Sequence, residues 1–267
     1  MSFVGDMKGR ASDIVDRLLV GFGFGHSESR LERDAATFWT GEEDDHWRNS
    51  THINDGSVFD QVEWESVGRR HLELFDRMSY STRAEGPLTR AVEWGVGGGA
   101  NAVAFAPSVD EFVGVDVKQS ILDAASSQVA KYTDTPFTPV LVDVEHPESA
   151  EAEIGTVDLF LCLYVLELVP SQQYGLRVMQ IAHRLLSEGG LAFVQIKYDT
   201  GRWNTRSRGR RYRGSVAASM TTWRIDEFWS LMTDMGFEIE NGVHLVPKNE
   251  LDERYAYFLL RKPLQAK

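Results

Sequence analysis

The fold is decided by the sequence Ala91-Val-Glu-Trp-Gly-Val-Gly-Gly-Gly-Ala-Asn101, together with Glu111-Phe-Val-Gly-Val-Asp116. An apolar strand is expected to end at Val92, and a short helix is expected from Asn101 to Ala106. Three glycines lie between them at alternate positions: Gly95, Gly97 and Gly99. Glycines suit such a turn because they accept positive φ angles and let a ligand lie against bare backbone. This part of the chain therefore predicts a strand, a glycine turn and a helix N-terminus.

The second part predicts another buried strand, Phe112 to Val115, which ends on Asp116. An acid at this place can accept hydrogen bonds from the hydroxyl groups of a ribose. Two ligand classes compete for the pocket, because the glycines also satisfy the pattern Gly-x-Gly-x-x-Ala of an NAD-dependent oxidoreductase. Glu93 favours the other class, since a carboxylate before the turn repels a pyrophosphate but suits a ligand with an amino group and a sulfonium.

At these residues the chain resembles class I S-adenosylmethionine-dependent methyltransferases, whose motif I reads acid-x-Gly-x-Gly-x-Gly. Glu93, Gly95, Gly97 and Gly99 occupy the positions of that motif, and Asp116 corresponds to the ribose-binding acid. The resemblance covers about residues 85 to 263 and implies S-adenosylmethionine as the cofactor. It also assigns to the cofactor site four further residues: Val117, Asp143, Val144 and Tyr164. Asp143 would approach the exocyclic amine of adenine, although an acid that merely ends a strand or caps a helix explains it as well.

Residues 86–267 alternate between expected strands and helices, which predicts a parallel sheet with helices on both faces. Further strands are expected at 138–142, 157–164 and 191–196, and helices at 120–132, 174–185 and 222–236. Ser187-Glu-Gly-Gly190 is expected to separate a helix from the strand that follows it. A C-terminal hairpin, 237–246 with 254–261, is typical of class I methyltransferases. The predicted fold is α/β, with a Rossmann-like, mostly parallel seven-stranded sheet.

The most hydrophobic expected strand resembles motif IV of the same family and leads into Tyr164-Val-Leu-Glu167. Ligands of open α/β sheets bind at the carboxyl ends of the strands, so Tyr164 and Glu167 are expected near the sulfonium. Methylation of an alcohol requires a base, and Glu167 is the first candidate. The histidine that often follows the fourth strand in related O-methyltransferases is absent here, which leaves Lys197, Tyr198 and His146 as further candidates.

Residues 1–85 are predicted to form an N-terminal helical cap or substrate lid, with helices at 12–20, 31–39 and 64–78. His71 lies on an apolar stripe of the third helix, as a core histidine or a substrate-binding residue. Three tryptophans could line a pocket or form the core of the cap: Trp39, Trp47 and Trp64. His46 and His52 do not match the spacing of known metal-ligand sets, so no metal is expected.

Composition limits the remaining possibilities. The net charge of −12 argues against nucleic-acid or anionic-membrane binding. We expect a cytoplasmic protein, since no window resembles a membrane span or a signal peptide. The single cysteine, Cys162, lies in an apolar run and is expected to be a buried thiol. The basic segment 197–213 follows an expected strand end, where it is either a solvated loop or a substrate-facing one.

The substrate class can be narrowed by elimination. The Asn/Asp-Pro-Pro-Tyr/Phe tetrapeptide of base N-methyltransferases is absent, and so is the ligand set of the metal-dependent catechol enzymes. A small polar metabolite or saccharide remains, bound with the help of Trp203 and Arg206, and O-methylation is the first expectation. N-methylation of a small molecule and a non-catalytic nucleoside-binding protein remain as alternatives. A homo-oligomer is possible.

Overall fold

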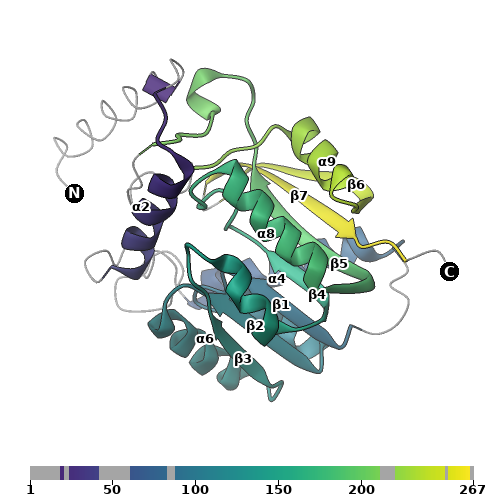
Figure 1. Cartoon of the computed structure of the whole chain (residues 1–267). Helices are drawn as coiled ribbons and strands as arrows, with labels where there is room; N and C mark the ends of the chain where they lie inside the picture. Colours follow the sequence, from purple (N-terminus) through teal and green to yellow (C-terminus); the bar gives the residue numbers. More distant parts are fainter. Residues whose placement is uncertain are drawn as a thin grey trace.

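Within the described residues, one sheet of seven strands has the order β3-β2-β1-β4-β5-β7-β6 (Figure 1). The strands β1 to β5 are parallel, and β7 is antiparallel to both β5 and β6. Their bounds are β1 Arg90–Trp94, β2 Glu111–Asp116, β3 Phe137–Leu141, β4 Val157–Cys162, β5 Leu186–Lys197, β6 Glu238–Lys248 and β7 Glu253–Arg261. This computed structural model describes residues 19–20, 24–41, 61–82, 88–210, 220–249 and 252–264. The predicted Rossmann-like sheet and its C-terminal hairpin are confirmed.

Helices cover both faces of the sheet (Figure 1). One face packs against α4, α5 and α6, and the other packs against α7, α8 and α9. Their bounds are α4 Gln61–Ser79, α5 Ala100–Phe105, α6 Gln119–Tyr132, α7 Glu151–Ile154, α8 Gln172–Leu185 and α9 Ile225–Asp234. Because α4 contributes buried side chains to the same core as α5 and β1, it is part of the main body of the fold. The division of the chain near residue 85 stays a prediction.

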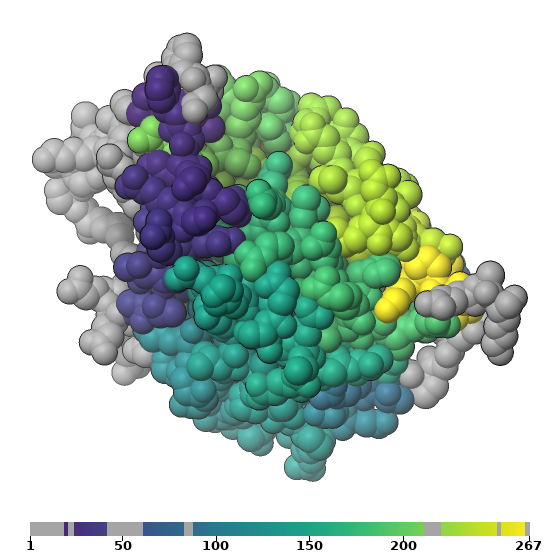
Figure 2. Space-filling view, in the orientation of Figure 1, coloured from purple at the N-terminus to yellow at the C-terminus, as the bar shows by residue number. Residues whose placement is uncertain are grey.

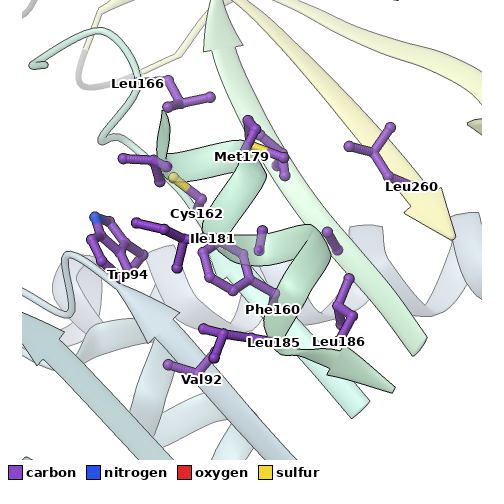
Figure 3. Packing of buried hydrophobic residues seen from close by; sticks show 14 of the residues in the cluster. Val92, Trp94, Phe160, Cys162, Leu166, Met179, Ile181, Leu185, Leu186 and Leu260 are labelled. Carbon is purple, nitrogen blue, oxygen red and sulfur yellow. The ribbon is translucent and has the colours of Figure 1, made fainter. Parts of the chain in front are cut away.

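The core is built by the alternation of side chains along each strand. In β4, Phe160 contributes to the cluster on the α8 face, and Leu161 contributes to the opposite cluster. Figure 3 shows Ile181 and Leu185 of α8 beside Phe160 and Val92 of the sheet. Cys162 is fully buried in this cluster, as expected of a structural thiol.

Several boundaries differ from the predicted ones because tertiary pairing sets them. β1 continues past Val92, since Glu93 and Trp94 pair with β2. β4 ends at Cys162, which leaves Tyr164 in the following loop. β5 begins at Leu186 and not at Leu191, because Leu186 pairs with Val157 of β4.

The start of α9 is also later than predicted. It begins at Ile225, because the N–H groups of Thr222 and Trp223 donate to the Ser207 hydroxyl and to the Lys197 carbonyl oxygen.

One further helix, α2 (Glu28–Thr40), lies across the carboxyl-terminal edge of the sheet. Its Leu31 and Ala35 form a small cluster with Val144 and Met220. Figure 2 shows α2, in purple, lying against the green surface of the sheet domain. Arg177 of α8 holds it there with an ion pair to Glu32 of 2.6 Å.

Some expectations concern residues outside the described part of the chain. These are His46, Trp47, His52 and most of the helix expected at 12–20. Trp64 is buried in α4, and Trp39 packs partly buried beside the α2 cluster. In the described residues no helix could cross a membrane, and no group of three or more His, Cys, Asp or Glu side chains could hold a metal ion.

Candidate functional site

The candidate site lies at the carboxyl ends of β1, β2 and β4. β1 has β2 on one side and β4 on the other. After β1 the chain therefore continues toward one edge of the sheet, and after β4 it continues toward the other edge. Such a switch point opens a crevice that loops cannot fill, and ligands of open α/β sheets bind there.

The glycine turn after β1 has a shape that only glycine adopts easily. Gly95, Gly97 and Gly99 have φ angles of +76°, +51° and +86°. A Cβ atom on Gly95 would lie 2.4 Å from Cγ2 of Val165, in the loop after β4. The turn and that loop are therefore in close contact, and α5 begins directly after Gly99. A Cβ atom on Gly99 would lie 3.3 Å from Cα of Ala125, so at both positions the missing side chain permits close packing of the turn.

Asp116 ends β2 and faces this turn. One carboxyl oxygen accepts the Gly97 N–H at 3.0 Å, and the other accepts the Val117 N–H at 2.8 Å. Burial raises the pKa of the Asp116 carboxyl to about 6, and these two backbone hydrogen bonds oppose that rise. Each oxygen keeps a further lone pair, so the carboxyl can accept one hydrogen bond from each of two ribose hydroxyl groups.

Glu93 lies below the turn and is 1% exposed. The side-chain amide of Asn101 donates to its Oε1 at 2.6 Å, whereas its Oε2 is buried without a hydrogen bond of normal geometry. Burial raises the pKa of Glu93 to about 8, against the effect of the Asn101 hydrogen bond. An unsatisfied buried carboxyl oxygen is unfavourable unless a ligand or water pairs with it.

His71 of α4 joins this group from the side. Its Nδ1 lies 2.7 Å from Oδ1 of Asn101, and its Nε2 lies 3.1 Å from the hydroxyl of Tyr257 in β7. Burial lowers the pKa of His71 to about 4, so the ring is neutral. Both ring nitrogens therefore have partners within the protein.

Tyr164 follows β4 with a φ angle of +58°, which is strained for a residue other than glycine. The side-chain oxygen of Gln195 in β5 holds this conformation by accepting the Tyr164 N–H at 2.6 Å. The tyrosine hydroxyl accepts a hydrogen bond of 2.9 Å from Asn249, and its ring packs edge-on against Tyr255. Residues of β5 and the β6–β7 hairpin thus fix Tyr164 beside the turn.

Glu167 is 2% exposed in the same loop, and its Oε2 has no hydrogen-bond partner. Burial raises the pKa of Glu167 to about 7, and the nearby charge of Lys197 opposes the rise. Lys197 itself is buried in an ion pair with Asp252. Because this pairing occupies the ammonium group, Glu167 is the better candidate for a proton acceptor at neutral pH.

The predicted adenine side of the pocket lies beside α2. Val117 and Val144 both pack with that helix. Lys118 donates from Nζ to the carbonyl oxygen of Gly41, just after α2, at 2.9 Å. Asp143 is exposed and accepts the Glu145 N–H at 2.8 Å, so its carboxylate also stabilises its own loop.

The remaining predicted site residues lie nearer the surface. His146 is exposed in the loop after β3, and Tyr198 is half-buried at the end of β5. Trp203 is 55% exposed, and Arg206 lines an open cavity of about 350 Å³. The described part of the basic segment contacts the chain before α2, since Arg210 donates to the Phe24 carbonyl oxygen at 2.7 Å. Arg211 and Arg213 lie outside the described residues.

Sequence reasoning did not identify four polar residues that position this site: Asn101, Gln195, Asn249 and Tyr257. Gln195 carried a signal, because an amide side chain in an apolar strand must have a buried partner. Asn249 and Tyr257 have partners from distant parts of the chain, and Asn101, although only eight residues after Glu93, is linked to His71 of another helix; no local pattern indicates these contacts.

Comparison with known proteins agrees with this geometry. Residues 92–192 match the family model described as a methyltransferase domain. No curated protein matches the chain.

Three solved structures share the fold. Magnesium protoporphyrin IX methyltransferase from Synechocystis PCC 6803, with bound SAH, is 13% identical over 87% of this chain and 99% of its own, with a TM-score of 0.58. N-methyltransferase NodS from Bradyrhizobium japonicum WM9, in complex with S-adenosyl-L-homocysteine, is 16% identical over 88% of this chain and 97% of its own, with a TM-score of 0.56. A protein from Bacillus halodurans C-125, described as a candidate methyltransferase, is 15% identical over 72% of this chain and 99% of its own, with a TM-score of 0.52. At these identities the likeness concerns the fold.

Proposed function

We propose that this chain is a class I S-adenosylmethionine-dependent methyltransferase that transfers a methyl group to an oxygen atom of a small polar metabolite or a saccharide. The observation that carries the proposal is the buried carboxyl of Glu167. It lies in the loop after β4, against which the glycine turn packs.

The residues around the turn fit the methyl donor. Asp116 offers an acceptor on each carboxyl oxygen for the ribose, and Glu93 offers an unpaired oxygen for a cationic group. Val117 and Val144 supply apolar surface for the adenine. When bound, S-adenosylmethionine supplies a methyl group on a positively charged sulfur.

Glu167 suits an acceptor that must lose a proton. An alcohol is a poor nucleophile until its proton is removed, whereas a free amine requires no base before attack. Burial places the pKa of Glu167 at about 7, so the carboxylate can take up a proton near neutral pH. Gln195 and the ion pair of Lys197 with Asp252 hold its surroundings in place.

The alternatives make different demands. N-methylation of a small molecule would tolerate the loss of the Glu167 carboxylate, and a non-catalytic nucleoside-binding protein would show no turnover at all. Among the compared structures, one acts on a porphyrin and one is an N-methyltransferase, so the fold does not select the acceptor.

The first experiment is calorimetric titration of the protein with S-adenosylhomocysteine and, separately, with NAD. We expect micromolar binding of S-adenosylhomocysteine and none of NAD. Binding of NAD instead would refute the proposal, and no binding of either would do so as well.

The second experiment measures methyl transfer from labelled S-adenosylmethionine to a panel of alcohols, saccharides and amines. Glu167→Gln should retain donor binding and lose turnover with a hydroxyl acceptor by about a hundred-fold or more. Glu188→Gln, at an exposed position of β5, is the matched control. Full activity of Glu167→Gln would exclude it as the base, and transfer to amines alone would favour N-methylation.

A further inference from the structure

Five buried or half-buried side chains form a continuous hydrogen-bond chain between the two sides of the candidate site. It runs from Glu93 through Asn101, His71 and Tyr257 to Tyr164. The successive distances between polar atoms are 2.6, 2.7, 3.1 and 3.4 Å. Four elements contribute: β1, α5, α4 and β7, together with the loop after β4. The chain therefore joins the glycine turn to Tyr164 by a route through α4.

The chemistry of the groups fixes the direction of these hydrogen bonds. Oδ1 of Asn101 can only accept, so Nδ1 of His71 must donate to it. In a neutral ring Nε2 is then an acceptor, and the hydroxyl of Tyr257 donates to it. The single hydroxyl proton of Tyr257 also faces the hydroxyl oxygen of Tyr164 at 3.4 Å, so Tyr257 is the shared donor between His71 and Tyr164. From Tyr257 through His71 and Asn101 the donors point toward Glu93, and the Tyr257 hydroxyl connects this run to Tyr164.

The packing of α4 shows how closely His71 is held. A Cβ atom on Gly68, one turn before His71, would lie 2.0 Å from the carbonyl oxygen of Ala100. Only glycine lets α4 approach the start of α5 this closely, and Asn101 is the next residue of α5. The rings of Tyr164 and Tyr257 lie 5.1 and 5.6 Å from the His71 ring, so the histidine is enclosed by its partners.

We propose that His71 is a positioning residue of the methyl-transfer site: through Asn101 it orients the Glu93 carboxyl below the glycine turn, and through Tyr257 it orients the Tyr164 hydroxyl beside the acceptor. The inference rests on the proposed function, since it concerns the same site. It gives α4 a role in coupling donor binding to the acceptor side. The sequence alone predicts α4 only as part of an outer cap. A histidine that only fills the core would stabilise the fold without such coupling.

A double-mutant cycle distinguishes positioning from simple packing. Tyr257→Phe and Asn101→Leu each remove polar atoms that contact His71, and the two residues are linked through its ring. Each should weaken S-adenosylhomocysteine binding by about five-fold, the equivalent of one hydrogen bond. Because both break the same chain, the double variant should also lose about five-fold, whereas independent sites would lose about 25-fold.

The matched control is Tyr255→Phe, on the same face of β7 and in contact with Tyr164. The structure shows no hydrogen bond from its hydroxyl within the described residues, so donor affinity should be unchanged. In a His71→Leu background, Tyr257→Phe should not weaken binding further. Thermal unfolding of every variant is measured in parallel, because a packing role would lower the melting temperature and leave the affinities multiplicative.

The outcomes separate the two proposals. If the unaltered protein does not bind S-adenosylhomocysteine, the proposed function fails, and this inference fails with it. If the unaltered protein binds but Tyr257→Phe behaves like Tyr255→Phe, or the losses multiply, His71 is structural and only this inference is overturned. The cycle at Tyr257 and Asn101 is complete without the His71→Leu background, so poor folding of that variant does not remove the test.

Discussion

Substitution of Gly95 by alanine should show how strictly the glycine turn depends on its backbone shape. At a φ angle of +76°, a Cβ atom costs about 1–2 kcal/mol of conformational strain. That atom would also lie 2.4 Å from Cγ2 of Val165, and overpacking of this kind typically costs about 1–3 kcal/mol. Alanine restricts the unfolded chain, which offsets about 0.4–1 kcal/mol. The net loss of unfolding free energy should be about 2–4 kcal/mol.

Gly201→Ala is the matched control, because it separates strain from overlap. Gly201 has a φ angle of +82°, and no atom lies within 4 Å of the position of its Cβ. This variant should lose about 1 kcal/mol, from strain alone. Urea unfolding of both variants gives the difference directly, provided that the slopes with denaturant are equal.

Calorimetry with S-adenosylhomocysteine supplies the functional half of this test. In Gly95→Ala, movement of the turn away from Val165 should weaken S-adenosylhomocysteine binding by about ten-fold or more, equivalent to about 1.4 kcal/mol. Gly201→Ala should bind the ligand normally. Equal stability of the two variants, with normal ligand affinity in both, would refute the assignment of the turn as a backbone-shaped binding surface.

Three further predictions concern charged groups of the site. Asp116→Asn should weaken S-adenosylhomocysteine binding about ten- to a hundred-fold in calorimetry, since a charged acceptor of hydrogen bonds is lost, while the exposed Asp110→Asn should not. The Glu167 carboxyl has a pKa of about 7 in the folded protein and 4.5 in the unfolded chain, so the folded protein binds this proton more tightly. The free energy of unfolding should therefore fall by about 3 kcal/mol as pH rises from below 4.5 to above 7. Urea unfolding between pH 5 and 8 should therefore show a smaller loss for Glu167→Gln than for the unaltered protein, and an identical slope would contradict the assignment. Arg177→Gln removes the ion pair that holds α2 and should speed ligand dissociation in stopped-flow measurements by several-fold. Arg184→Gln removes a similar ion pair, with Glu151, that does not involve α2, and it should leave the dissociation rate unchanged.

The sequence predicted the parts of the site that depend on neighbouring residues. A strand, a glycine turn and an acid at the end of the next strand are local features, so Glu93 and Asp116 were placed correctly at the carboxyl-terminal edge of the sheet. The pairing of strands was less accessible: the apolar run through Tyr164 does not indicate that β4 ends at Cys162. The limit of a strand is set by its neighbours, which the run itself does not contain.

The polar contacts of the site could not be predicted for a related reason. His71 and Tyr257 are 186 residues apart, and Lys197 and Asp252 are 55 apart. His71 on an apolar helical stripe is compatible with a core position or a ligand contact, and only the position of Asn101 distinguishes them. Lys197 is a candidate base by its place at the end of β5, but its ion pair with Asp252 makes that role less suitable.

The buried acids at the edge of the sheet should favour a cationic ligand there. Glu93, Asp116 and Glu167 are all buried, and burial raises the pKa of each. Buried carboxyl groups weaken a fold at any pH where they must ionise, so their presence at one edge is best explained by binding. An opposite charge within about 4–6 Å favours the ionised form and recovers part of this free energy. S-adenosylmethionine carries a sulfonium that S-adenosylhomocysteine lacks. The same acids should therefore hold the charged donor more tightly than its neutral-sulfur product, which favours exchange of product for donor after each transfer.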